Sequence, residues 1–208
     1  MLLLGVPYWG GIKAQTFIEE LQKAEAIRLQ YGENNDKYLD ALTTAIQAAF
    51  GEEKYEEANK YRLIHSNVIK EKYGETSLEY AEDLWRLGKI SDFKGEEYVF
   101  NCYKKAEEIY NEINGQAEYP YCDIMFRLFS HYADAEDLQK SLYYLDKHLS
   151  LSDIWISKEW KGLTIRIEDL PYKYIILGQL HEMAEDLSSA HTAYVTALEL
   201  SRDVGDNQ

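Results

Sequence analysis

Apolar side chains recur every three or four residues along most of the chain, a spacing that places them on one face of an α-helix. Tyr80, Leu84 and Leu87 follow this pattern, and so do Ile109 and Ile113. Breaks in the pattern delimit the helices that we expect, at about 12–31, 36–50, 52–73, 77–93, 96–114, 119–133, 137–151, 171–184 and 187–203. The pattern therefore predicts an all-α protein made of consecutive helices.

Two kinds of break alternate along the chain. The longer breaks contain Gly32, Gly74 and Gly115, which we expect to adopt the left-handed conformation that ends a helix. The side chains that can cap the following helices are Asn34, Asn35, Thr76 and Ser77. The shorter breaks fall at 50–53, 93–96 and 133–137. The expected unit is thus a helix hairpin of about forty residues.

The longer breaks also repeat as sequence. The stretch EKYGETSLEYAEDL (71–84) matches LQYGENNDKYLDAL (29–42) at an offset of 42 residues, with tyrosine, glycine, glutamate and leucine in register. A third copy, INGQAEYPYCDIM, has Gly115 in the place of Gly74. Repetition of a supersecondary unit at such a period is typical of helical repeat proteins.

The last hairpin carries the clearest spacing. Counted from Pro171, Leu177 is at position 7, Gly178 at 8, Ala190 at 20 and Tyr194 at 24. This spacing resembles that of the tetratricopeptide repeat family. Small residues at positions 8 and 20 let the two helices approach closely, and larger residues fill the space around them.

The other hairpins keep parts of this spacing. The first keeps Leu42, Ala45 and Ala58. The second keeps Leu84, Leu87 and Gly88 and then loses register through two or three extra residues. The third has Met125, Leu128, Tyr132, Ser141 and Leu145 in the expected roles, but Phe129 where a small residue is usual. The resemblance thus covers about residues 12–203, and it is strongest at the C-terminal end.

The resemblance implies one right-handed superhelix, an α-solenoid of stacked antiparallel hairpins over residues 1–208, with about four repeats and an N-terminal partial repeat. The 42-residue period resembles the variety found in kinesin light chains and in bacterial repeat proteins. The expected parts are a partial repeat at 1–32, repeats at 33–74, 75–115, 116–151 and 171–203, an irregular connection at 152–170 and a polar tail at 204–208. We expect Trp155 and Trp160 to pack this connection.

The N-terminus opens in mid-repeat, because Leu4-Gly5 and Tyr8 reproduce positions 7, 8 and 11 of a hairpin. Solenoids need a polar cap at each end. An opening of this kind is therefore expected in a fragment of a longer array, and the uncapped edge would allow self-association.

A near-match to a zinc motif lies in the same C-terminal hairpin. His181-Glu182 begins like the H-E-x-x-H of metalloproteases, but the second histidine is replaced by Glu185. Glu185 and His191 could in principle join a metal site. Because His181 falls at repeat position 11, which faces the hairpin interface, we expect it to be a packed, hydrogen-bonded side chain.

The other residues that could take part in catalysis form no active-site pattern in the sequence. His65, His131 and His148 lie far apart along the chain and form no nucleophile arrangement with a cysteine or serine. The sequence contains no phosphate-binding glycine loop, and the acidic doublets have the spacing of solvated helix faces. We therefore expect no catalytic residue, no metal and no cofactor.

Charge and cysteine content narrow the class of partner. The 37 acidic and 22 basic side chains give a formal net charge of -15, which repels nucleic acid and anionic membrane surfaces. Cys102 and Cys122 suggest neither a disulfide framework nor a zinc cluster. The apolar start lacks the basic region of a signal peptide, and no apolar run reaches the ~18 residues of a membrane span. We expect a cytoplasmic protein.

The resemblance implies that the first helices of the hairpins line a concave face that binds peptides. The face positions give the predicted binding residues Thr44, Gln47, Trp85, Arg86, Lys89, Phe126, Arg127, Ser130, Tyr172 and Gln179. Arg86 and Arg127 share one repeat position, so they should lie side by side near Trp85 and Phe126 and suit a carboxylate flanked by an apolar group. In the alternative, both arginines neutralise neighbouring acids such as Glu82 and Asp123.

The carboxylate-clamp pattern of chaperone-binding tetratricopeptide domains is not matched, since Thr43 and Asp123 occupy two of its positions. We therefore predict a non-enzymatic protein-interaction module that holds a peptide or partner protein of unspecified identity. One alternative is a regulatory or ligand-sensing array within a larger polypeptide or complex. A metal-dependent enzyme is the third, remote alternative.

Overall fold

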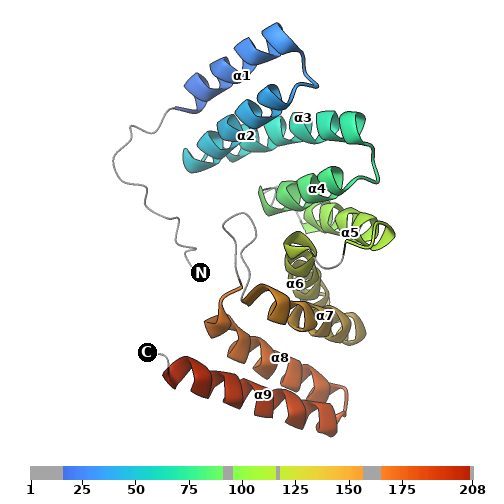
Figure 1. The fold of residues 1–208 in the computed structure, drawn as a ribbon. Coiled ribbons are helices and arrows are strands. Elements are labelled where there is room, and N and C mark those ends of the chain that lie inside the picture. The colour runs from blue at the N-terminus through green and yellow to red at the C-terminus, as the bar shows by residue number, and fades with distance from the viewer. Residues whose placement is uncertain (1–15, 91–95, 116–117, 157–164, 207–208) are drawn as a thin grey trace. The chain divides into compact units, whose positions relative to one another are not determined.

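A computed structural model of the chain describes residues 16–90, 96–115, 118–156 and 165–206 (Figure 1). Their helices are α1 (Phe17–Tyr31), α2 (Asp36–Gly51), α3 (Tyr55–Tyr73), α4 (Leu78–Ile90), α5 (Glu96–Glu112), α6 (Tyr119–Asp134), α7 (Leu138–Ile156), the 3-10 turn η2 (Ile167–Asp169), α8 (Leu170–Met183) and α9 (Leu187–Asp206). These described residues contain helices and no strands, which confirms the predicted all-α repeat fold.

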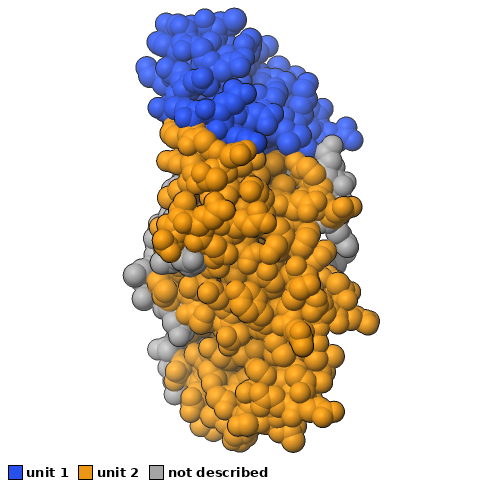
Figure 2. All heavy atoms as spheres, turned by 90° about the vertical axis from the view of Figure 1, so that its right-hand side faces the viewer, with its two compact units in different colours: residues 1–72 blue, residues 73–208 orange. Residues whose placement is uncertain are grey.

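The helices pack into two compact units, residues 1–72 with α1 to α3 and residues 73–208 with α4 to α9 (Figure 2). In the first unit, the Phe17 ring lies 5.8 Å from the Tyr61 ring, and the Phe17 N–H donates to Glu52. Thr43 on α2 is hydrogen-bonded to His65 on α3 at 3.3 Å. Polar bonds between helices thus accompany the apolar packing of this unit.

The second unit has one continuous core. Its helices pack as the hairpins α4–α5, α6–α7 and α8–α9, with α6 also against α5 and α8 against α7. Ile109, Ile124, Leu128 and Leu145 in this core are fully buried. Successive hairpins therefore bury one another, as expected for a repeat array.

Side-chain caps explain where several helices begin. Thr16 and Glu19 form a reciprocal capping box at the start of α1. Asn35 accepts the Lys37 N–H at 2.9 Å at the start of α2, and Ser77 accepts the Tyr80 N–H at 3.1 Å at the start of α4. Two of the four predicted capping residues, Asn35 and Ser77, thus have this role.

The helix ends match the prediction at two of the three longer breaks. Gly32 and Gly74 have φ of 86° and 97°, the left-handed region that favours glycine. At the third break the prediction was wrong, because Asn114 takes the left-handed conformation at φ 55° and Gly115 does not. Gly115 donates its N–H to Tyr110 O at 2.8 Å, and a Cβ on it would lie 2.8 Å from the Tyr110 ring. Close packing, rather than conformation, explains this glycine.

The three described turns within hairpins share one arrangement. Glu53, Glu136 and Glu185 have φ of 60°, 57° and 60°. The N–H of the residue after each glutamate donates to the carbonyl five residues earlier, at 2.8 Å in the first turn and 2.9 Å in the other two. These are Schellman turns in which glutamate occupies the position that usually belongs to glycine.

The α7 helix runs further than the sequence pattern predicted. It continues to Ile156, whereas an irregular connection was expected from residue 152. Trp155 in this extension is buried, and its ring meets Tyr119 edge-on at 5.7 Å, so it packs from a helix and not from the expected irregular connection. Trp160 lies outside the described residues.

Candidate binding surface

The first helices of the second unit, α4, α6 and α8, carry a chain of polar and aromatic contacts. The Trp85 indole on α4 donates to Asp123 Oδ2 on α6 at 2.7 Å and meets the Tyr119 ring at 6.4 Å. The Phe126 ring on α6 in turn lies 4.6 Å from the Lys173 ammonium on α8. These contacts join three helices that are far apart in the sequence, and we call the face that they form the α4–α6–α8 face.

Basic side chains gather at the α4 end of this face. The Lys89 ammonium lies 4.6 Å from the centre of the Trp85 ring, a cation–π contact. Burial lowers the pKa of Lys89, the nearby charges of Arg127 and Arg86 lower it further, and Asp123 opposes them. Lys89 therefore lies within electrostatic range of both arginines and of Asp123.

The two arginines are matched by acids. Arg86 pairs with Glu82 one turn earlier on α4, and Arg127 Nε lies 3.6 Å from Asp123 Oδ2 on α6. Exposed pairs one turn apart contribute little stability, roughly 0.3–0.5 kcal/mol. The two acids nevertheless neutralise the charges of Arg86 and Arg127, which an approaching ligand would meet first.

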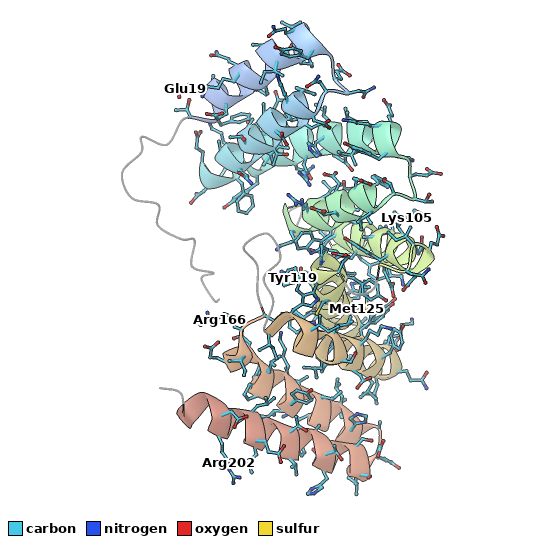
Figure 3. The ribbon with its side chains drawn as sticks, viewed as in Figure 1. Glu19, Lys105, Tyr119, Met125, Arg166 and Arg202 are labelled. Carbon is cyan, nitrogen blue, oxygen red and sulfur yellow. The ribbon has the colours of Figure 1, made fainter. Side chains whose placement is uncertain are left out.

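A cavity of about 160 Å³ opens further along the face, between α6, α7 and the start of α8. Its lining residues are Tyr119, Asp123, Phe126, His148, Ile165, Arg166, Asp169 and Lys173. Figure 3 shows Tyr119 at the start of α6 and Arg166 ahead of α8 on one side of the unit, with Lys105 of α5 on the opposite side. The cavity therefore combines an aromatic wall with charges of both signs.

His148 forms the floor of this cavity. Its side chain is 3% exposed, and burial together with the neighbouring Lys173 charge lowers its pKa to about 4. Nδ1 lies 2.9 Å from the Cys122 carbonyl, which assigns the proton of the neutral ring to Nδ1 and leaves Nε2 as an acceptor. Nε2 lies 2.9 Å from Lys173 Nζ, which donates to it.

Cys122, beside His148, is a packing residue. Its thiol is 3.5 Å from His148 Nδ1, and burial raises its pKa to about 12. A nucleophilic cysteine needs a lowered pKa and access to solvent. The raised pKa and the burial of Cys122 are therefore the opposite of what a catalytic cysteine–histidine pair needs.

The structure brings some of the predicted binding residues together and leaves others apart. Trp85, Arg86, Lys89, Phe126 and Arg127 belong to the contacts described above. Ser130 and Arg127 line a second cavity of about 230 Å³ between α5 and α6, where the Phe100 and His131 rings stack at 4.1 Å.

The outlying predicted residues are exposed. Tyr172 is 69% exposed and does not line the 160 Å³ cavity, and Gln179 is also exposed. Thr44 and Gln47 are exposed on α2, in the first unit.

Three residues of the α4–α6–α8 face and its cavity, Asp123, His148 and Lys173, are not among the predicted binding residues. Asp123 was considered as a neutralising acid and as a mismatch to the carboxylate clamp. His148 lies on a second helix, and Lys173 falls at repeat position 3, outside the positions assigned to the face. Only Lys173 has a signal in the sequence, because it is a basic residue directly after Pro171-Tyr172 in an acid-rich chain.

His181 and Glu185, the residues that resemble part of a zinc motif, lie at the end of α8 and in the turn to α9. His181 Nδ1 lies 3.7 Å from Asp186 Oδ2, and the His181 side chain is partly buried at the end of α8. Glu185 forms the left-handed turn to α9. Within the described ranges, no group of three histidine, cysteine, aspartate or glutamate side chains is arranged to hold a metal ion.

No helix in the described part of the chain combines the length and the apolar composition that a membrane span requires. No protein-family model matches the sequence, and no curated protein sequence matches it.

Solved structures match the fold. BtubC (BKLC) from P. vanneervenii superposes with a TM-score of 0.67 at 16% identity, over 91% of this chain and 72% of that one. A Podosopora anserina putative kinesin light chain with nearly identical TPR-like repeats gives 0.63 at 8% identity, over 90% and 86%. MamA gives 0.58 at 15% identity, over 91% of each chain.

These likenesses establish the class of fold. The described residues have the fold of tetratricopeptide-type helical repeat proteins, as the spacing around Gly178 predicted. Solenoids of this architecture present extended surfaces that can serve for binding.

Proposed function

We propose that the chain is a non-enzymatic scaffold that binds a peptide segment of a partner protein on the α4–α6–α8 face. The observation that carries the proposal is the gathering of Trp85, Lys89 and Arg127 around Asp123, where side chains of two successive repeats meet. Tryptophan and arginine are the residues that most often dominate protein interfaces. Such a surface suits a segment that presents both acidic and apolar side chains.

The charge of the chain supports a protein partner rather than nucleic acid. The net charge is -15, whereas this face and its cavity hold five basic residues, Arg86, Lys89, Arg127, Arg166 and Lys173, against four acidic ones, Glu82, Asp123, Glu168 and Asp169. An anionic segment would therefore be guided to this face and repelled elsewhere. We place this scaffold in the cytoplasm, without a cofactor.

The test selects peptides on the immobilised protein from a displayed random library and measures their affinity by fluorescence polarisation. Because both arginines lie on the proposed face, the double variant Arg86→Ala/Arg127→Ala should weaken binding at least about 10-fold while circular dichroism stays unchanged. Lys105→Ala removes a cation from an exposed pair with Glu108 on α5 and should leave the affinity unchanged. Equal binding by the double variant and the wild type would contradict the proposed location.

A further inference from the structure

Lys173 differs from the arginines of the α4–α6–α8 face because it forms no close ion pair with a carboxylate of the described residues. Burial lowers its pKa, and the more distant charges of Asp169 and Asp123 oppose this shift. Among the described residues, its ammonium makes one hydrogen bond, to His148 Nε2 at 2.9 Å, and one cation–π contact, with Phe126 at 4.6 Å. No carboxylate of these residues lies within ion-pair distance of Nζ. An ammonium group can donate three hydrogen bonds, so two of its N–H groups make no hydrogen bond to the described residues.

His148 holds this ammonium in place without supplying charge. Burial and the neighbouring Lys173 charge favour the neutral ring. Its Nδ1–H donates to the Cys122 carbonyl, which fixes the tautomer and directs the Nε2 lone pair at Lys173. The ring also lies 5.0 Å from Phe126, which closes the same side of the cavity. The ammonium is thus held in place by a histidine and a phenylalanine before any ligand arrives.

The remaining walls indicate the ligand. Tyr119, Phe126 and Ile165 offer apolar surface, and Arg166 supplies a second cation at the rim, 3.6 Å from Glu168. Asp123 and Asp169 also line the cavity, and their charges repel a dianion more strongly than a monoanion. A cavity of about 160 Å³ with this charge balance accommodates a singly charged group on a short apolar stem better than a phosphate.

We infer that this cavity is a carboxylate subsite, in which Lys173 pairs with an acidic side chain or the C-terminal carboxylate of the bound segment, and Phe126 contacts its stem. The inference rests on the proposed function and deepens it, because it moves the charged anchor from the neutralised arginines to Lys173. The arginines then act as a rim that steers the segment.

The first arm of the test uses small probes. Butyrate, its neutral isostere butyramide and inorganic phosphate are titrated into the full chain, and the ring nitrogens of His148 are followed by ¹⁵N NMR. Butyrate should give a saturable shift at His148 and butyramide should not. Lys173→Met retains the apolar stem on Phe126 and should weaken butyrate binding at least about 10-fold, because it removes the cation. Lys105→Met is the matched control.

The second arm uses a peptide selected on the wild-type protein. Each Asp or Glu of the peptide is replaced by its amide, and one replacement should weaken binding to the wild type about 10-fold but have little effect on Lys173→Met. Circular dichroism of Lys173→Met verifies the fold, and Lys173→Arg should restore part of the discrimination.

Three results would overturn the subsite: butyrate shifts in Lys173→Met equal to those of the wild type, tighter binding of phosphate than of butyrate, or amide replacements that weaken binding equally in both proteins. Failure of the proposed function is distinguishable, because peptides would then bind independently of Arg86 and Arg127 while butyrate still bound at Lys173.

Discussion

The α4–α5 and α8–α9 hairpins use the same packing device in different surroundings. In each, a glycine on the first helix lies directly beneath a tyrosine ring on the second, Gly88 beneath Tyr103 and Gly178 beneath Tyr194. Tyr103 is 4% exposed within the continuous core, whereas Tyr194 is only partly buried and reaches Glu182 with its hydroxyl at 3.0 Å. The same glycine–tyrosine contact is therefore rigid where other side chains cover the tyrosine ring and adaptable where the ring is partly exposed.

We expect the largest loss of stability at the buried glycine–tyrosine contact, between Gly88 and Tyr103. A Cβ at Gly88 would lie 2.7 Å from Cε1 of Tyr103, a ring that neighbouring side chains keep in place. Gly88→Ala should therefore lower the free energy of unfolding by about 2–3 kcal/mol, as overpacking does in closed cores. Urea denaturation followed by circular dichroism measures it.

Gly51→Ala is the control, because nothing lies within 4 Å of its added Cβ. It should be neutral or stabilise by up to about 1 kcal/mol, since alanine favours the helix over glycine. A Gly88→Ala protein as stable as Gly51→Ala would show that the α4–α5 interface is loosely packed.

A smaller effect is expected at the terminal copy. Gly178→Ala would bring its Cβ even closer to the Tyr194 ring, but this partly exposed ring can move outward. We expect a loss of about 1 kcal/mol, measured by the same denaturation experiment. In the double variant Gly178→Ala/Tyr194→Leu the two effects should be less than additive, because the smaller side chain relieves the overlap. Additive losses would mean that the two residues do not press on one another.

The smallest effect concerns the turns, which are alike in the inner and terminal hairpins. Glu136 and Glu185 have positive φ, which is unfavourable for any residue except glycine, asparagine or aspartate. Glu136→Gly and Glu185→Gly should each raise the free energy of unfolding by up to about 1 kcal/mol, visible as a higher melting temperature by calorimetry.

Glu199→Gly is the control for these turns. It removes an exposed glutamate from the interior of α9 and should destabilise the protein by about 1 kcal/mol. If the turn variants were destabilised to the same extent, the left-handed conformation of these glutamates would be disproved.

The helices could be predicted closely because their signals are local. Apolar spacing located the helices to within a few residues at most of their ends, and Asn35, Ser77, Gly32 and Gly74 have the roles that their types favour. The turn at Asn114 was missed because asparagine and glycine both tolerate the left-handed region, and packing against Tyr110 decided between them.

The residues of the α4–α6–α8 face could be predicted only in part. Repeat positions placed Trp85, Arg86 and Lys89 together, since side chains on one face of a helix follow its period. They did not identify Asp123 as the shared partner of Trp85 and Arg127, because that choice depends on how α4 and α6 approach each other.

The sequence by itself determined the class of fold, since helix periodicity, caps and the spacing around Gly178 all act over a few turns. The tertiary structure alone decided which cations lie against a carboxylate and which lie against other groups. Lys173 and His148 are 25 residues apart and meet only when α7 packs against α8. Burial and ion pairing are sums over neighbours from several helices, so no single stretch of sequence contains them.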